Sequence, residues 1–209
     1  MNQTISFAYI FFSILFIVLI SATNLSVHWL LKIIPILILW MMVWRAEFFK
    51  HRLLLLGALT ASVVGDILLH RDLFVLGLSA FLIAQIQYAF LFYQFRKLPV
   101  HRLGLSFILL IYLVGMLVLL IPNLGEMMIP VFGYLIAISA MGFLAIQSSL
   151  PIKWAVLGAL VFILSDSLIA ANKFMFEVPH DRLFVMSTYY AAQWLLVSGF
   201  LSNKGIFSE

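Results

Sequence analysis

The chain alternates long apolar segments with short polar breaks. Each apolar segment has about 20 residues, which is the length that an α-helix needs to cross the hydrocarbon core of a membrane. No segment alternates polar and apolar residues as a strand of a membrane β-barrel would. The pattern therefore predicts an all-α, polytopic membrane protein with about eight transmembrane helices, at 5–22, 26–44, 53–70, 73–95, 103–121, 128–148, 152–172 and 183–202.

The breaks between these segments carry charged and turn-forming residues. Residues 96–102 combine basic side chains with a proline, and residues 122–126 read Pro-Asn-Leu-Gly-Glu, so both are expected to be loops. The short His-Arg-Asp break at 70–72 predicts a tight hairpin between two helices. The second predicted helix is the least regular one, because Lys32 and Pro35 interrupt it.

Composition supports a membrane protein and excludes several other classes. The chain is 65% hydrophobic and 10% charged, with a mean hydropathy of +1.18, whereas a soluble domain has about 25% charged residues. We therefore treat 1–209 as a single integral membrane domain embedded in the lipid bilayer. The absence of cysteine excludes disulfides and thiol chemistry. The net charge of +4 lies in short loops, so no nucleic-acid partner is expected.

The positive charges also predict how the chain is oriented. Cytoplasmic loops of membrane proteins carry an excess of Lys and Arg. An arrangement with both termini in the cytoplasm, as in a bacterial inner membrane, places eight of these residues inside and three outside. The inside group is Arg45, Lys50, Arg52, Arg96, Lys97, Arg102, Lys153 and Lys204, and the outside group is Arg71, Lys173 and Arg182. No basic residue precedes Lys32, so the first segment is expected to be an uncleaved span.

Two acidic residues, Asp66 and Asp166, lie inside apolar segments. A carboxylate at membrane depth costs about 3 kcal/mol, so such residues usually face a polar cavity and mark function. In the predicted orientation Asp66 lies ~6 Å and Asp166 ~9 Å below the outer end of its helix, at 1.5 Å per residue. Leu-Gly-Ala-Leu precedes each Asp, and Ala-Gln occurs in the segment that follows each. This similarity suggests a 4+4 parallel repeat with the two Asp across a pseudo-two-fold axis.

Other polar residues are predicted at a similar depth and are candidates to bind a substrate. Each also has a structural interpretation: Lys32 can pair with Asp66 or extend to the membrane surface, and Lys173 can pair with Asp166 because it lies seven residues further on the same helix face. The amides and tyrosines can instead form hydrogen bonds between helices. The full set is Lys32, Gln85, Tyr88, Lys173, Tyr190 and Gln193.

The sequence contains no His/Cys cluster with zinc spacing, no phosphate-binding loop and no dinucleotide-binding glycine pattern. We therefore expect neither a metal nor a cofactor. An enzyme and a proton-coupled transporter of small solutes both suit intramembrane Asp, Gln and Tyr. The inner halves of the predicted helices look apolar, which favours a site closed on one side. The oligomeric state is not indicated.

The order of several motifs resembles that of the YhhN/TMEM86 family of multi-pass membrane proteins, whose characterised members are lysoplasmalogenases. The first motif is Gly-Asp with a Leu three residues after the Asp, followed by Phe-x-x-Gly-Leu-x-x-Phe, and the second is built around Ser-Asp-Ser. The third is Tyr-x-Ala-Gln. The matching residues are Gly65, Asp66, Leu69, Phe74, Gly77, Leu78, Phe81, Gly158, Ala159, Phe162, Ser165, Asp166, Ser167, Ala170, Lys173, Phe174, Tyr190, Ala192 and Gln193.

Two positions depart from the family pattern. The family usually has His where this chain has Gln85, and Lys-Pro adjacent where Lys32 and Pro35 are separated. Gln cannot transfer a proton, so only a hydrogen-bonding role is expected at position 85.

The resemblance implies hydrolysis of the vinyl ether of a lysoplasmalogen, giving a fatty aldehyde and a glycerophospho-alcohol. One carboxyl group protonates the alkenyl carbon distal to the ether oxygen, and the other, ionised, stabilises the oxocarbenium ion and activates water, as the two carboxylates of glycosidases do. Asp66 and Asp166 fit these roles. We favour Asp66 as the acid, because Lys173 would keep Asp166 ionised. The lipid phosphate is expected near Lys32, Lys173 or Arg182.

Overall fold

The computed structural model describes residues 3–22, 28–47 and 49–202 and contains eight long α-helices. The prediction of an all-helical protein is confirmed, and most helix ends lie within two residues of those expected. Residues 26–27, predicted to start the second helix, and Lys204 lie outside the described residues. The helices are α1 (Gln3–Ala22), α2 (His28–Arg45), α3 (Arg52–His70), α4 (Phe74–Gln94), α5 (Leu103–Leu120), α6 (Met128–Ile146), α7 (Leu157–Phe174) and α8 (Asp181–Leu201).

Short irregular turns join some of these helices. The 3₁₀ turn η1 (Val100–Arg102) precedes α5, and η2 (Ile121–Asn123) and η3 (Gly125–Met127) connect α5 to α6. A π-helical turn, η4 (Ile152–Val156), leads into α7, so the predicted seventh span starts as a wider helix. The expected hairpin between α3 and α4 is present, with Asp72 in a left-handed conformation at φ 58°.

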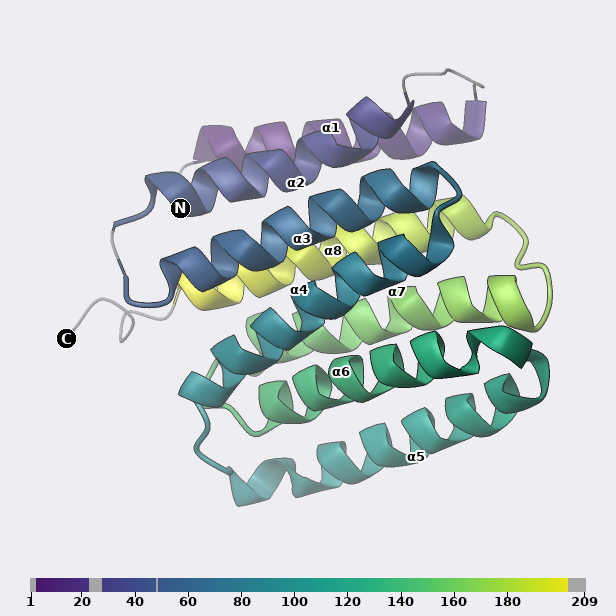
Figure 1. Ribbon diagram of the computed structural model, residues 1–209. Helices are drawn as coiled ribbons and strands as arrows, with labels where there is room; N and C mark the ends of the chain where they lie inside the picture. Colours follow the sequence, from purple (N-terminus) through teal and green to yellow (C-terminus); the bar gives the residue numbers. More distant parts are fainter. Residues whose placement is uncertain (1–2, 23–27, 48, 203–209) are drawn as a thin grey trace.

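The helices form a bundle in which successive helices run in opposite directions (Figure 1). The hairpins α3–α4 and α7–α8 occupy the middle, α1 and α2 lie on one side, and α5 and α6 on the other. Because the number of helices is even, α1 begins and α8 ends at the same end of the bundle. The connections α3–α4, α5–α6 and α7–α8 all lie at the opposite end, which we call the hairpin end.

Seven of the helices, α1 to α7, are long and apolar enough to cross a membrane. Helix α8 has 21 residues but a more polar sequence, and about half of its residues are buried in the bundle. Its close contact with η4 and α7 depends on small residues. A Cβ atom on Gly199 would lie 2.6 Å from the backbone nitrogen of Ala155, and one on Gly158 would lie 2.8 Å from that of Leu196. These contacts bring the polar face of α8 to the centre of the protein.

The outer surface of the bundle is strongly apolar. Large hydrophobic side chains are exposed along α1, α4, α5 and α6, for example Phe11 at 61%, Phe90 at 58% and Phe107 at 63%. Such a surface is stable in contact with lipid and not with water. The protein is therefore an integral multi-pass membrane protein.

Pro35 does not break α2, which is helical on both sides of this buried residue.

Candidate active site

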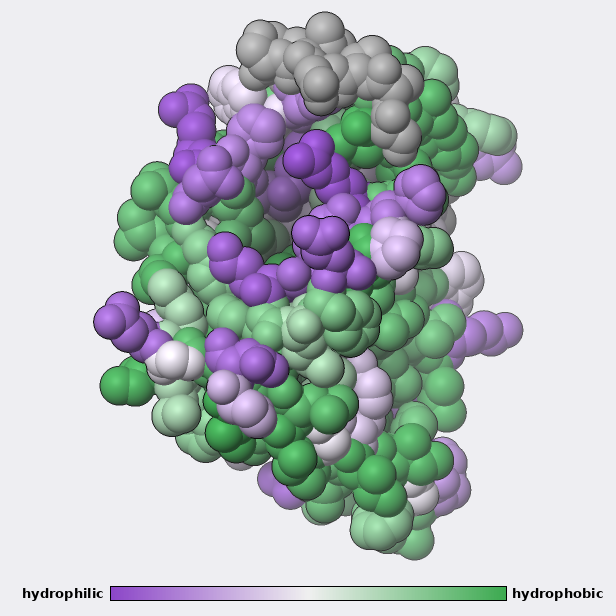
Figure 2. Space-filling model, turned by 90° about the vertical axis from the view of Figure 1, so that its right-hand side faces the viewer, coloured by the Kyte–Doolittle hydropathy of each residue, from purple (hydrophilic) through white to green (hydrophobic). Residues whose placement is uncertain are grey.

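A polar cavity of about 560 Å³, here called the mouth, opens at the hairpin end of the bundle. Figure 2 looks onto this end and shows hydrophilic residues gathered around a recess. Both signs of charge surround the mouth, so it suits a ligand that is itself charged. The ionisable residues that line it are His28, Lys32, His70, Asp72, Lys173, Asp181 and Arg182.

Asp66 lies beneath the mouth and is paired with Lys32. The side-chain nitrogen Nζ of Lys32 is 2.8 Å from Oδ1 of Asp66, and the hydroxyl of Tyr189 donates to Oδ2 at 2.8 Å. Asp66 is only 2% exposed, whereas the Lys32 side chain is 14% exposed and lines the mouth. Lys32 thus connects the mouth to a carboxylate that is otherwise sealed off.

Gly65 allows an aromatic ring to close the apolar side of this pair. A Cβ atom at Gly65 would lie 2.6 Å from the ring of Phe81 on α4. The Phe81 ring also packs edge-on against Tyr189, with centroids 6.0 Å apart. The small residue before Asp66 therefore serves close helix packing.

Asp166 belongs to a second hydrogen-bonded group on α4, α6 and α7. The Tyr134 hydroxyl donates to Oδ2 of Asp166, and Nε2 of Gln85 donates to the Tyr134 hydroxyl at 3.2 Å. Gln85 is fully buried, and none of the described residues donates a hydrogen bond to its Oε1 atom. A buried acceptor without a donor reduces the free energy of unfolding by about 1–3 kcal/mol, so Gln85 is destabilising at this position in that respect.

Two narrow cavities meet at Asp166. The first, here called the hairpin cavity, has a volume of about 60 Å³ and lies among α3, α4, α6 and α7. The second, the α5 cavity, has about 50 Å³ and lies among α5, α6 and α7. Leu69, Phe74 and Ile169 border both the mouth and the hairpin cavity, so Asp166 lies one layer of side chains below the mouth.

The two carboxyl groups are within electrostatic range of each other but have different partners. Asp66 has a cation and a tyrosine, whereas Asp166 has a tyrosine whose hydroxyl is oriented by an amide. The sequence predicts one layer of polar residues, and the structure divides these residues into two hydrogen-bonded groups, one around Asp66 and one around Asp166.

The remaining predicted polar residues hold helices together. Tyr88 donates to Oε1 of Gln193 at 2.7 Å, and Nε2 of Gln193 donates to Ser62 at 3.1 Å. The Tyr190 hydroxyl donates to the backbone carbonyl of Lys32 at 2.8 Å. Tyr88, Gln193 and Tyr190 do not line the mouth, the hairpin cavity or the α5 cavity, and their contacts here are with other helices.

The expected pairing of Lys173 with Asp166 is wrong. Lys173 is exposed at the mouth, and its ammonium lies 5.2 Å from the ring centroid of Phe74. Seven residues along a helix return to the same face but also rise ~10.5 Å, which is too far for direct contact. Tyr134 from the neighbouring helix occupies the position beside Asp166 instead.

Sequence reasoning missed the two tyrosines that contact the carboxyl groups. Tyr134 is an isolated polar residue in the middle of the apolar helix α6, which is the same signal that identified the two Asp. Tyr189 was overlooked beside Tyr190, which belongs to the Tyr-x-Ala-Gln motif.

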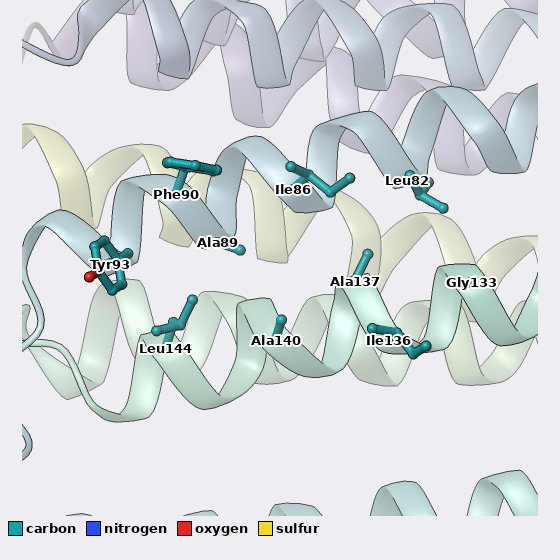
Figure 3. Close-up of a pocket in the computed structure, with 10 residues that line it drawn as sticks. All are labelled: Leu82, Ile86, Ala89, Phe90, Tyr93, Gly133, Ile136, Ala137, Ala140 and Leu144. Atoms are coloured by element: carbon teal, nitrogen blue, oxygen red, sulfur yellow. The ribbon is translucent and has the colours of Figure 1, made fainter.

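A further hollow of about 440 Å³ runs between α4 and α6 and is shown in Figure 3. Of the ten residues that line it, only Tyr93 carries a polar side-chain atom. Ile86, Phe90 and Ile136 along it are 43–58% exposed on the apolar outer surface. This hollow is a groove open to lipid and not a candidate for acid–base chemistry.

Comparison with known proteins agrees with the motif order. The model of the YhhN family matches residues 27–200. The lysoplasmalogenase TMEM86B of Rattus norvegicus is 35% identical over 179 residues, which cover 85% of this chain and 74% of that protein. The human lysoplasmalogenase TMEM86B is 34% identical over 170 residues, covering 80% and 72%.

A bacterial relative has a sequence identity to this chain close to that of the mammalian relatives. The lysoplasmalogenase of Mycobacterium tuberculosis is 32% identical over 166 residues, covering 75% of this chain and 64% of that protein. No solved structure gave a significant match. Because the family model covers most of the chain and the relatives align over most of its length, this chain belongs to the YhhN family.

Proposed function

We propose that this protein is a lysoplasmalogenase, a membrane-embedded hydrolase that cleaves the vinyl ether of an alkenyl lysophospholipid. Relatives named lysoplasmalogenase, at 32–35% identity over most of the chain, support this activity. The observation that carries the proposal is the position of Asp166, a carboxyl group in a narrow apolar cavity directly below a charged mouth. A lysolipid has its ether bond at such a boundary between polar and apolar parts.

We assign the acid role to Asp166. The Lys32 ammonium 2.8 Å away makes Asp66 the charged member of the pair, whereas the contacting partner of Asp166 is a neutral tyrosine. Asp166 also lines the cavities, and Asp66 does not. This assignment reverses the one favoured from the sequence, which depended on a Lys173–Asp166 pair.

The hydrogen bonds around Tyr134 indicate which oxygen of Asp166 carries the proton. The Gln85 amide nitrogen can only donate, so the Tyr134 oxygen accepts from it. The single Tyr134 proton is then donated to Oδ2 of Asp166. The acidic proton of Asp166 is therefore on Oδ1, where it is available to the substrate.

The reaction follows from these roles. Asp166 transfers its proton to the alkenyl carbon distal to the ether oxygen, and the resulting oxocarbenium ion is stabilised by the negative charge of Asp66. Water adds to the cationic carbon and loses a proton to the Asp166 carboxylate. Asp166 then protonates the ether oxygen of the hemiacetal as the carbon–oxygen bond breaks. The hydroxyl of the departing carbon loses its proton to the Asp166 carboxylate, which releases the aldehyde and the alcohol and leaves Asp166 protonated for the next cycle.

The lower half of the bundle favours an enzyme over a carrier. Below the Tyr88–Gln193 layer the centre is filled by Leu55, Leu59, Phe92 and Phe200, which are at most 1% exposed. A carrier needs a polar path that reaches the second side of the membrane. The packed apolar centre supports a site that opens at the hairpin end alone.

The distribution of charge supports an orientation. The basic residues of the α2–α3, α4–α5 and α6–α7 connections lie at the end opposite the mouth. By the positive-inside rule, that end and both termini are cytoplasmic, and the mouth opens on the outer side of a bacterial inner membrane.

The substrate class is tested with purified protein and three lysophospholipids that share a head group. One carries an alkenyl ether, one a saturated alkyl ether and one an acyl ester. The proposal predicts aldehyde release from the alkenyl lipid and no hydrolysis of the other two, because only the vinyl ether forms an oxocarbenium ion on carbon protonation. Release of fatty acid from the ester, or no product from any alkenyl lipid, would overturn it.

A further inference from the structure

Asp166 lies between two cavities that approach it from opposite sides. The hairpin cavity reaches it from the mouth, and the α5 cavity reaches it from the edge of the bundle. The two cavities share the side chains of Val131, Tyr134, Asp166 and Ala170. The mouth therefore leads to the hairpin cavity, which leads past Asp166 to the α5 cavity.

The α5 side of this series is apolar. Leu113, Met116 and Leu120 of α5 face Ile163 of α7 across the α5 cavity, and its few polar groups belong to Asp166, Ser167 and Tyr134. The mouth, in contrast, is surrounded by seven ionisable residues. The hairpin cavity is apolar as well, so the lining changes from charged at the mouth to apolar in the two cavities on either side of Asp166.

Helix α5 is the loosely packed wall of the α5 cavity. Only 17% of the residues in its span are buried, compared with 44% for α4 and for the span containing α6. It lies at the edge of the bundle (Figure 1). At its start, the Arg102 guanidinium donates to the carbonyl oxygens of Ser148 and Leu150 at 2.7 and 3.2 Å. The helix is therefore fixed at that end and makes few contacts along its length.

We infer that the α5 cavity binds the alkenyl chain of the substrate, which passes Asp166 and continues between α5 and α7 into the bilayer. The inference rests on the proposed function. The scissile bond of a lysoplasmalogen joins a charged glycerophospho group to an apolar chain, so the acid that acts on it needs a polar space on one side and an apolar space on the other. A cavity of about 50 Å³ holds only a short stretch of one chain, so the remainder extends into lipid.

The first test narrows the α5 cavity and compares long-chain with short-chain substrates. Met116→Trp places a larger side chain in the cavity, and Val118→Trp adds the same side chain on a lipid-facing position of α5 that is 62% exposed. The KM of Met116→Trp for a long-chain lysoplasmalogen is expected to rise roughly tenfold or more. Its KM for a short-chain analogue, and both values for Val118→Trp, should stay within about twofold. An equal rise for both chain lengths in Met116→Trp would overturn the inference.

The second test does not depend on hydrolysis, so it separates this inference from the proposed function. A saturated alkyl lysophospholipid with a diazirine in the middle of its chain is photolysed with the full-length protein in nanodiscs, and the labelled peptides are mapped by mass spectrometry. Labelling is expected in 103–120, reduced by Met116→Trp and unchanged by Val118→Trp. Labelling of the α4–α6 groove of Figure 3, or equal labelling of all lipid-facing helices, would contradict the assigned path.

Discussion

Asp66 on α3 and Asp166 on α7 both lie inside apolar helices, yet their surroundings differ. Asp66 is sealed, ion-paired with Lys32 and hydrogen-bonded to Tyr189. Asp166 lines two cavities, and its hydrogen-bond partner among the described residues is the Tyr134 hydroxyl. A buried ion pair is stable only when its partners stay in place, whereas a carboxyl group without a cation can exchange its proton with a substrate. The difference separates an electrostatic role from an acid–base role within one layer of the protein.

The largest effect is expected when Asp166 loses its acidic proton. Asp166→Asn keeps the shape of the side chain but cannot protonate carbon, so kcat should fall by about 10²–10⁴-fold. Aldehyde release by the purified variant measures this. Glu126→Gln makes the same chemical change at an exposed loop position and should retain native activity. A kcat for Asp166→Asn within threefold of the native value would refute the acid role.

The Lys32–Asp66 pair is expected to matter for stability as well as activity. Lys32→Met leaves a buried carboxylate without its cation, which should reduce the free energy of unfolding by about 3 kcal/mol. The double variant Lys32→Met/Asp66→Asn removes both charges and should be more stable than Lys32→Met alone. Denaturation in detergent provides the measurement. Additive effects of the two substitutions would show that the pair is not coupled.

Substitution of the two tyrosines tests whether the two carboxyl groups have different roles. Tyr134→Phe removes the hydrogen bond that Tyr134 donates to Asp166 and takes away the acceptor of the Gln85 amide nitrogen, so kcat should fall by about 10–100-fold. Tyr189→Phe removes one of two partners of Asp66 and should lower kcat by only a few fold. The pH–rate profile should move for Tyr134→Phe and stay in place for Tyr189→Phe. The reverse order of effects would exchange the two assigned roles.

The smallest effect concerns Gln85. Gln85→His retains a nitrogen that can donate to Tyr134, so activity within about threefold of native is expected. Gln85→Leu removes the donor and should reduce kcat about as much as one neutral hydrogen bond, roughly fivefold. Equal activity of the two variants would show that the Tyr134 hydroxyl does not need orientation by this side chain.

Much of the fold follows from the sequence, because an apolar segment of about 20 residues crosses a membrane as an α-helix. Eight helices, their approximate ends and the α3–α4 hairpin were predicted from segment length and turn residues. The π-helical turn at η4 was not, since no pattern of apolar residues distinguishes it from an α-helix.

The candidate site could be predicted only along the helices and not across them. Depth follows from the rise per residue, so Lys32 and Asp66 were predicted at a similar depth, and their ion pair, one of the two interpretations of Lys32, is present. Lateral neighbours depend on how helices pack. Gln85 and Tyr88 share a face of α4, yet Gln85 bonds to α6 and Tyr88 to α8. The same limitation explains why Tyr134, and not Lys173, is beside Asp166.

Hydrolysis in D₂O tests most directly whether Asp166 delivers a proton to the alkenyl carbon. The aldehyde is reduced to the alcohol as it forms, so that later exchange with solvent is prevented, and the position of deuterium is determined. We expect one deuterium on the carbon next to the former aldehyde carbon, a slower reaction than in H₂O, and loss of both product and label in Asp166→Asn. An aldehyde without deuterium at that carbon would contradict the mechanism.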